Sequence, residues 1–167
     1  MNRIGTKVLA VVPARGGSKG IPRKNLCRLA GRSLIAHVAA VVADLDWLAY
    51  AVLSTDDTEI AEEGRRCGLE VPFMRPPQLS GDRATAVDTW RHAWLASEEA
   101  TGLQFAQSVL LEPTSPLRTP DDVEHAVRML TEHRCSSVVT VSRSPAHFAP
   151  ERTLRIDEHG YLGPNLA

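Results

Sequence analysis

The stretch Val8-Leu-Ala-Val-Val12, followed at once by Pro-Ala-Arg-Gly-Gly-Ser-Lys-Gly-Ile-Pro-Arg-Lys-Asn at residues 13–25, decides the fold of this chain. The apolar, valine-rich run from Lys7 to Val12 predicts a buried strand. Pro13 stops that strand because proline has no N–H for a strand ladder. The three glycines that follow let the backbone turn sharply and let a ligand come close to it.

The loop that follows this strand carries four cations, Arg15, Lys19, Arg23 and Lys24. Successive free backbone N–H groups form a concavity that suits an anion. Positive side chains around such a turn favour a polyphosphate, so the sequence indicates a site for a nucleoside triphosphate. The alternative is an ordinary solvated basic loop, because surface loops are often rich in glycine and charge.

The charge of the chain is unevenly distributed. No acidic residue precedes Asp44, whereas eight Lys or Arg residues do. The whole chain has a net charge of −1, so the residues from Asp44 onward carry −9. Lys19 and Lys24 are two of only three lysines, against sixteen arginines. This distribution indicates an anion-binding end rather than a generally basic protein.

Length and composition limit the class of protein. A chain of 167 residues with 43% hydrophobic and 23% charged residues is typical of one globular domain. A sequence pI near 6.6 argues against a nucleic-acid or membrane-surface partner. We expect a cytoplasmic protein, because no signal peptide is evident and three widely spaced cysteines fit a reducing compartment.

Hydrophobic periodicity predicts alternating strands and helices. Strands are expected over 7–12, 47–54, 71–74, 107–111 and 136–142, and helices over 33–44, 58–68, 85–100 and 119–133. Ser33 and Thr119 should cap the first and the last of these helices with their hydroxyl groups. Residues 26–31 should form a short connection, and the proline-rich segment 75–82 should be irregular. A small hairpin is expected around His159-Gly160. Trp90 and Trp94 should pack in the core with Val87 rather than stack on a base, because they stand four residues apart on a helix.

The alternation predicts a three-layer α/β domain with a mostly parallel sheet. Ligands of such domains bind beyond the carboxyl ends of the strands. Four polar or Pro/Gly-rich segments should meet there: residues 13–25, 54–57, 75–82 and 112–118. Their coincidence at one edge is the main physical argument for a composite site.

The basic loop fits two common nucleotide motifs poorly. A Walker A loop needs Gly-Lys-Ser/Thr, whereas Lys19 precedes Gly20, and no GxGxxG is present. Cations on both sides of a glycine turn suit nucleotidyl transfer, in which they and a divalent metal stabilise charge on the α-phosphate and the leaving pyrophosphate.

The chain resembles the CMP-sialic acid synthetases, also called acylneuraminate cytidylyltransferases, in residues 10–25, Ser54-Thr-Asp-Asp57, Arg75-Pro, Asp82 and Leu110-Leu-Glu-Pro-Thr-Ser-Pro-Leu-Arg118. The group includes relatives that act on legionaminic acid. The resemblance implies a Rossmann-like nucleotidyltransferase fold. It also implies a reaction in which CTP and a nine-carbon α-keto sugar acid give a CMP-sugar and pyrophosphate, with Mg²⁺.

The same resemblance implies roles for individual residues. Arg15, Lys19 and Lys24 would act in catalysis by holding the triphosphate. The remaining nucleotide-binding residues would be Ala14, Gly16, Gly17, Ser18, Asn25, Arg75, Asp82, Thr85 and Ala86, and the sugar acid would face Glu112, Thr114 and Ser115. No metal ligand is assigned in this chain.

Two features depart from the family. Glu112 stands where the family usually has Gln, so the sugar acid could differ from N-acetylneuraminate, or Glu112 could simply bind a backbone N–H or Arg118. The family's Asp-rich metal-binding segment has no counterpart here. We therefore expect a nucleotide-binding core at 1–143, followed by the start of a truncated C-terminal or dimerisation segment at 144–167. We also expect a homodimer if that segment suffices, and turnover that is weak or absent. The alternatives are a non-catalytic module that binds CTP or CDP, and a nucleotidyltransferase for another sugar or a cofactor.

Overall fold

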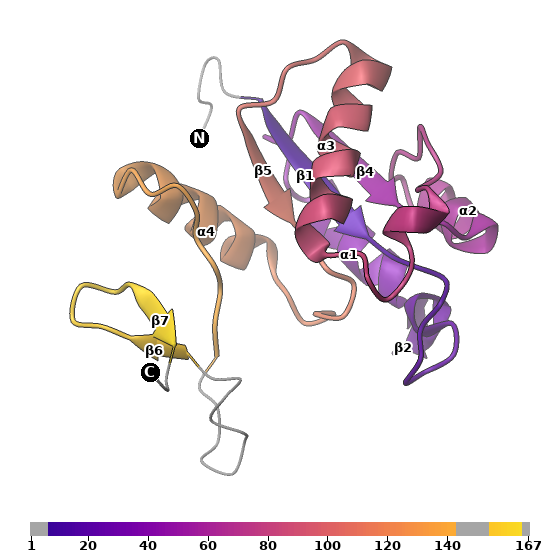
Figure 1. Ribbon diagram of the computed structural model, residues 1–167, viewed down its shortest axis with the longest axis horizontal. Helices are drawn as coiled ribbons and strands as arrows, with labels where there is room; N and C mark the ends of the chain where they lie inside the picture. Colours follow the sequence, from indigo (N-terminus) through magenta and orange to yellow (C-terminus); the bar gives the residue numbers. More distant parts are fainter. Residues whose placement is uncertain (1–6, 143–153, 165–167) are drawn as a thin grey trace.

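A three-stranded parallel sheet forms the centre of the protein (Figure 1). The structure, a computed structural model, describes residues 7–142 and 154–164. The sheet has the order β4-β1-β5, with β1 at Val8–Pro13, β4 at Tyr50–Ser54 and β5 at Gln107–Leu110. All three strands confirm expected ones, although β4 begins three residues later than predicted.

Strand β1 is central because it is apolar on both faces. Leu9, Ala10, Val11 and Val12 are fully buried, as expected for a strand covered by helices on both sides. The register pairs Val11 with Val52 of β4 and with Leu110 of β5. All three strands therefore end at the same edge, as the sequence predicted.

Helices α1 (Leu34–Ala43) and α2 (Thr58–Arg66) cover one face of the sheet. Ser33 caps α1 by accepting a hydrogen bond from the Ala36 N–H at 3.0 Å, as predicted. Helix α2 packs against β4 so closely that Gly64 has no room for a Cβ beside Leu53.

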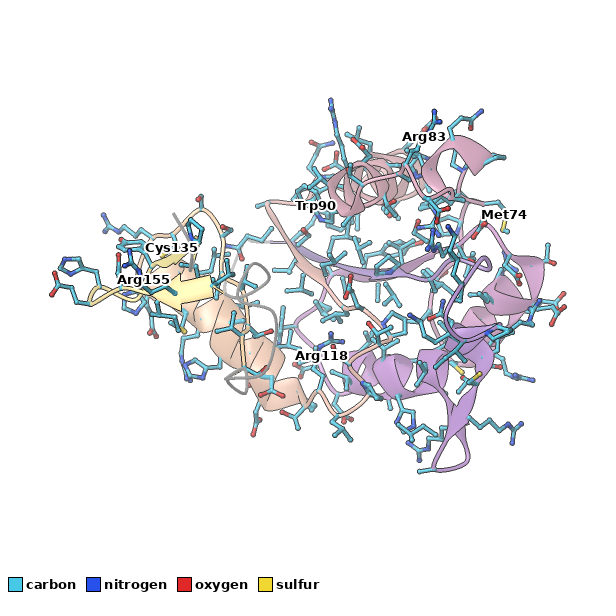
Figure 2. The ribbon with its side chains drawn as sticks, turned by 60° about the horizontal axis from the view of Figure 1, so that its bottom comes forward. Met74, Arg83, Trp90, Arg118, Cys135 and Arg155 are labelled. Carbon is cyan, nitrogen blue, oxygen red and sulfur yellow. The ribbon has the colours of Figure 1, made fainter. Side chains whose placement is uncertain are left out.

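Helix α3 (Ala86–Thr101) covers the opposite face, which completes the predicted three layers. Trp90 lies between α3 and the sheet and donates from Nε1 to Ser108 Oγ at 2.7 Å (Figure 2). Trp94 packs against the same cluster, so both tryptophans have the expected core position. The inward placement of Val87 was wrong, because its side chain is 65% exposed in the first turn of the helix.

Helix α4 (Pro120–Glu132) begins at the predicted cap. Thr119 and Asp122 form a capping box, and Pro120 occupies the first turn. Beyond α4, the antiparallel strands β6 (Leu154–Ile156) and β7 (Leu162–Pro164) form the expected hairpin (Figure 1). The expected boundary at residues 143–144 lies at the edge of the described residues, because 143–153 are not described.

The predicted strand over 71–74 is wrong. In this part of the chain only Glu70, just before the predicted strand, pairs with β4, through an isolated bridge to Val52. Pro72 has no N–H for a ladder, and the backbone N–H of Arg75 instead binds the Thr55 carbonyl at 2.7 Å. The following segment is not wholly irregular, because Pro77–Leu79 forms the short 3₁₀ helix η2.

Two other segments differ from expectation. Residues 136–142 form no strand, because no described strand lies beside them to take their hydrogen bonds, and Val139 and Val141 are exposed. The connection at 26–31 is more ordered than predicted. The 3₁₀ helix η1 (Lys24–Leu26) leads into a hairpin of β2 (Arg28–Leu29) and β3 (Arg32–Ser33).

Two global properties complete the description. No helix among the described residues has the length and apolar character needed to cross a membrane. Cys27, Cys67 and Cys135 are all free thiols.

Candidate functional site

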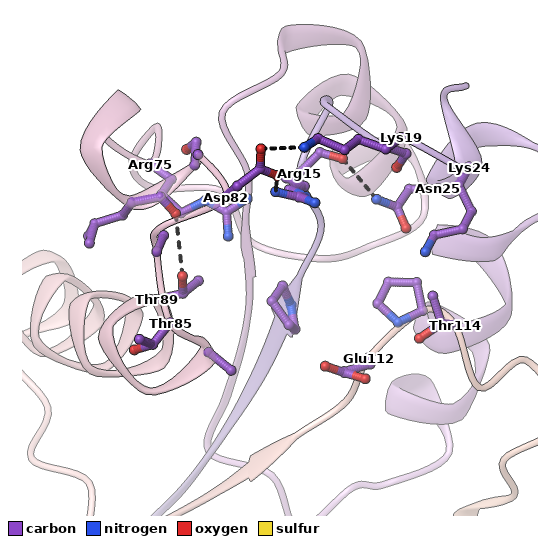
Figure 3. A pocket seen from close by; sticks show the side chains of 18 of the residues that line it. Arg15, Lys19, Lys24, Asn25, Arg75, Asp82, Thr85, Thr89, Glu112 and Thr114 are labelled. Atoms are coloured by element: carbon purple, nitrogen blue, oxygen red, sulfur yellow. Dashed lines mark hydrogen bonds and ion pairs between the residues drawn. The ribbon is translucent and has the colours of Figure 1, made fainter. Parts of the chain in front are cut away.

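A cleft of about 720 Å³ opens at the carboxyl edge of the sheet (Figure 3). The four segments expected there from the sequence either line it or adjoin it. Arg15 follows β1, Asp56 follows β4 behind the cleft wall, and Glu112 follows β5. Arg75 reaches the same edge through its backbone bond to Thr55 rather than by following a strand.

Most of the predicted site residues line this cleft. They are Arg15, Ser18, Lys19, Lys24, Asn25, Arg75, Asp82, Thr85, Ala86, Glu112 and Thr114. Ala14, Gly16, Gly17 and Ser115 are not among its lining residues. Ala14 is buried and binds the Ser54 carbonyl through its N–H, so it supports the loop from behind.

Two adjacent acids hold the basic loop in place. Asp56 accepts a hydrogen bond from the Gly16 N–H at 3.0 Å. Asp57 caps α2 and accepts from Arg23 at 3.2 Å, so the guanidinium of Arg23 points away from the cleft lining. A Cβ at Gly16 would lie 2.6 Å from Asp57 Oδ2, which explains why glycine is required there.

The backbone of the basic loop is already partly committed to internal hydrogen bonds. The Gly16 N–H binds Asp56, and the Ser18 N–H binds the Gly16 carbonyl at 2.9 Å. Buried Asn25 donates to the Arg15 carbonyl at 3.0 Å. The N–H groups of Gly16 and Ser18 are therefore engaged within the protein and do not face an anion in this conformation.

Asp82 joins two of these cations across the mouth of the cleft (Figure 3). Its carboxylate lies 2.6 Å from Lys19 Nζ and 3.3 Å from Arg15 Nη1. The hydrogen bond from Lys19 and the charges of Lys19 and Arg15 hold the pKa of the Asp82 carboxyl below its usual range. A carboxylate thus occupies the position in which phosphate oxygens would meet the same cations.

Arg75 is the buried cation of the site. Its side chain is only 4% exposed, and Nη2 lies 3.5 Å from Asp56 Oδ1. That contact has an ion-pair distance without hydrogen-bond geometry, and Nε and Nη2 have no hydrogen-bond partner among the described residues. Burial lowers the pKa of Arg75, while the Asp56 charge opposes this shift.

Glu112 lies in the turn after β5, and its carboxylate lines the cleft with no ion-pair or hydrogen-bond partner among residues 7–142 and 154–164. Its backbone carbonyl accepts hydrogen bonds from Arg118 Nη2 and the Ser115 N–H, each at 3.2 Å. Arg118 therefore fixes the turn through the Glu112 backbone and leaves the carboxylate directed at the cleft (Figure 3).

The first turn of α3 forms another wall of the cleft. Thr85 caps this helix and donates to Asp88 at 2.7 Å, so its hydroxyl is engaged. Thr89, one turn further on, also lines the cleft but was not predicted. Its position four residues after Thr85 was the available signal, because residues i and i+4 share a helix face. Ser80 and Gly81 were missed as well, although they lie in the segment 75–82 that was expected at this edge.

The residues of the cleft allow only a limited role in holding a metal ion. No group of three or more His, Cys, Asp or Glu side chains with suitable spacing for a metal occurs in the described part of the chain. The cleft carboxylates are Asp82 and Glu112. This set fits Mg²⁺ only in the manner in which that ion commonly binds, with one or two carboxylates, water and substrate phosphates.

Comparison with known proteins places this chain in a family. The family model described as Cytidylyltransferase matches residues 9–146. CMP-N,N'-diacetyllegionaminic acid synthase of Legionella pneumophila is 35% identical over 93% of this chain and 66% of its own length. N-acylneuraminate cytidylyltransferase of Streptococcus agalactiae serotype III is 33% identical over 93% of this chain and 36% of its own length. The chain thus spans two-thirds or less of these curated relatives.

Solved structures share the fold. CMP:2-keto-3-deoxy-manno-octonic acid synthetase complexed with CTP superimposes with a TM-score of 0.62 at 22% identity, covering 77% of this chain and 49% of that one. 4-Diphosphocytidyl-2C-methyl-D-erythritol synthase gives a TM-score of 0.57 at 14% identity, covering 87% and 67%. These likenesses confirm the predicted Rossmann-like nucleotidyltransferase fold, and the sequence relatives confirm the predicted family resemblance.

Proposed function

The chain belongs to the cytidylyltransferase family, and from this premise we propose that its cleft binds CTP and a nonulosonic sugar acid and forms a CMP-sugar and pyrophosphate. The proposal concerns the activity of proteins of the relatives' full length, and this chain covers two-thirds or less of that length.

The observation that carries the proposal is the concentration of cations in one cleft. Arg15, Lys19, Lys24 and Arg75 line the same cavity at the carboxyl edge of a parallel sheet. Lys24 has no ion-pair partner among the described residues, and Nε and Nη2 of Arg75 have no hydrogen-bond partner there, although Nη2 lies in ion-pair range of Asp56. A buried hydrogen-bond donor without an acceptor lowers the stability of the protein unless a ligand supplies the acceptor. This wall of the cleft is therefore suited to a ligand rich in hydrogen-bond acceptors.

The proposed chemistry is an in-line displacement at the α-phosphate. Arg15, Lys19 and Lys24 hold the triphosphate, and Arg75 contacts the nucleoside beside the first turn of α3. A sugar hydroxyl forms the new O–P bond while the bond between the α- and β-phosphates breaks. Pyrophosphate leaves with the bonding electron pair, and the hydroxyl proton passes to solvent. Positioning and charge stabilisation by the three loop cations supply most of the rate.

Magnesium belongs in this proposal as a companion of the nucleotide. Asp82 and Glu112 are the carboxylates of the cleft that could hold the magnesium ion, together with phosphate oxygens of the nucleotide. The ion supplies charge neutralisation on the phosphates when it is bound.

The proposed sugar-acid end of the cleft is the turn after β5, where Glu112 and Thr114 line the cleft and Ser115 follows just outside the lining. An ionised Glu112 accepts hydrogen bonds only, so it would face hydroxyl or amide N–H groups of the sugar rather than its carboxylate. The acylamino groups of N,N'-diacetyllegionaminic acid and of N-acylneuraminate, for which these relatives are named, are donors of this kind.

The remaining parts of the proposal concern assembly and location. We propose a homodimer in the cytoplasm, without a nucleic-acid or membrane partner. The exposed apolar side chains of Val139 and Val141 support self-association. The three free thiols support a location in the cytoplasm, and the net charge of −1 supports the absence of a nucleic-acid or membrane partner.

Titration calorimetry of the purified chain with CTP, UTP, ATP and GTP tests the nucleotide. Preferential binding of CTP supports the proposal, whereas preference for a purine, or binding of none, refutes it. A pyrophosphate-release assay with CTP, Mg²⁺ and several nonulosonic acids then separates an enzyme from a non-catalytic CTP-binding module. CTP binding without pyrophosphate release would assign the chain to that second class.

A further inference from the structure

Residues 55–57 contact both the basic loop and Arg75, although Asp56 is not itself part of the cleft lining. Asp56 Oδ1 accepts from the Gly16 N–H at 3.0 Å and lies 3.5 Å from Arg75 Nη2. Oδ1 of Asp56 therefore joins the basic loop to the buried guanidinium of Arg75 in the opposite wall.

Arg75 depends on this carboxylate for its position. The backbone of Arg75 is fixed by its bond to the Thr55 carbonyl, but the long side chain needs a partner of its own. Asp56 is the acidic side chain in ion-pair range of Arg75 among the described residues. A buried guanidinium with one charge partner takes its orientation from that partner, because few other contacts offset its loss of hydration.

We propose that Asp56 is a positioning residue that aligns Arg75 with the basic loop, so that one nucleotide can engage both walls at once. The proposal rests on the proposed function, in which Arg75 contacts the nucleoside and the loop cations hold the phosphates. Asp56 sets the spacing between those two groups of contacts.

A positioning role has a consequence that a purely structural role lacks. Inorganic tripolyphosphate can engage Arg15, Lys19 and Lys24 without Arg75, whereas CTP must engage both walls. A change that misplaces Arg75 but leaves the loop intact therefore weakens CTP binding and spares tripolyphosphate binding. A change that merely loosens the fold weakens both.

The test uses Asp56→Asn, which keeps an oxygen acceptor for the Gly16 N–H and removes the charge that faces Arg75. The matched control is Asp46→Asn, the same chemical change at an exposed turn residue with no hydrogen bond or ion pair in the described structure. Arg75→Lys and the double variant complete a double-mutant cycle. Affinities for CTP and for inorganic tripolyphosphate are measured by calorimetry, with thermal melting of each variant.

We expect Asp56→Asn to lower CTP affinity on the order of tenfold while tripolyphosphate affinity changes by less than about twofold. In the Arg75→Lys background the same change should have little further effect on CTP. Equal losses for both ligands, additive losses in the cycle, or a variant that is unfolded under the assay conditions would each overturn the inference. Wild-type protein that binds no CTP would instead refute the proposed function, and the inference with it.

Discussion

Asp82 places a negative charge among the cations that the proposed triphosphate needs. Its carboxylate is 56% exposed and contacts both Lys19 and Arg15. The pKa of Asp82 is lowered chiefly by the Lys19 hydrogen bond, so these contacts persist above the ordinary carboxyl pKa and weaken as the pH falls through the lowered value. At neutral pH the free protein therefore holds an internal competitor for phosphate.

Replacement of Asp82 by Asn should strengthen the binding of inorganic tripolyphosphate. The loss of the competing charge frees Lys19 and Arg15, and we expect a gain of about two- to fivefold at low salt, the scale of an exposed ion pair. Calorimetry with tripolyphosphate measures the change, and Asp46→Asn serves as the control. A fall in affinity would instead show that Asp82 assists phosphate binding, as it would if it helped to hold magnesium.

At the scale of single residues, the sequence predicted chemistry better than contacts. The loop cations Arg15, Lys19 and Lys24 were identified by their position around a glycine turn, whereas Arg75 was identified only by the family resemblance. Asp56 received no role, because its bonds to Gly16 and Arg75 join segments 40 and 19 residues apart. Such pairings depend on how the chain folds and leave no local pattern.

The contact between α2 and β4 shows how closely the elements around the cleft are packed. Gly64 lies against the fully buried Leu53, and a Cβ there would overlap Leu53 Cδ2. Strand β4 leads directly to Asp56, and α2 begins just after it. A change at this contact therefore acts on the segment that holds the basic loop.

Substitution of Gly64 by Ala should destabilise the protein despite the better helix propensity of alanine. The gain of about 1 kcal/mol from propensity is outweighed by overpacking, which costs about 1–3 kcal/mol. Urea unfolding should therefore show lower stability by about 1 kcal/mol, with partial recovery when Leu53→Val is added. Gly163→Ala, where the Cβ meets no atom within 4 Å, is the control. Unchanged or higher stability of Gly64→Ala would contradict this packing.

At the scale of elements, capped helices were the most predictable features. Ser33 and Thr119 each cap the helix predicted to begin with them, because a hydroxyl before an apolar repeat has a local physical role. Thr85 was predicted as the first helical residue and is instead the cap of α3. Segments 71–74 and 136–142 were mispredicted as strands because composition favours extended backbone there. A strand also needs a neighbouring edge, and sequence periodicity contains no information about that neighbour.

His92 links the stability of the whole domain to pH. It lies on α3 and packs edge-on against Phe73, with ring centroids 5.1 Å apart. Its Nδ1 is buried and has no hydrogen-bond partner among the described residues. Burial, followed by the charge of Arg75, lowers the pKa of His92 below its ordinary value of 6.5.

The domain should lose stability as the pH falls below about 6.5, because the unfolded chain then binds a proton that folded His92 resists. The loss should level off below the lowered pKa and should be absent above 6.5. Chemical unfolding across this range measures the slope for the wild type, for His92→Gln and for the exposed control His133→Gln. A slope that survives in His92→Gln would assign the pH dependence to other groups.

At the scale of the molecule, the layered architecture could be predicted because alternating periodicity leaves few arrangements. A valine-rich strand that is apolar on both faces has to be central, and β1 is. The gathering of the polar segments at one edge followed from parallel strands alone. The detailed shape of the cleft did not, because Arg75 reaches it through a loop held by Thr55 and not at the end of a strand.

The bridge from Asp82 to Lys19 and Arg15 makes the cleft resemble an ion exchanger that carries its own counter-ion. The proposed polyphosphate would displace a carboxylate that stays tethered to the chain. Binding would therefore release fewer dissolved anions from this cleft than from a cleft whose cations have no carboxylate partner. Because the release of such ions makes affinity depend on salt, the affinity of this cleft should fall less steeply with ionic strength than its number of cations suggests.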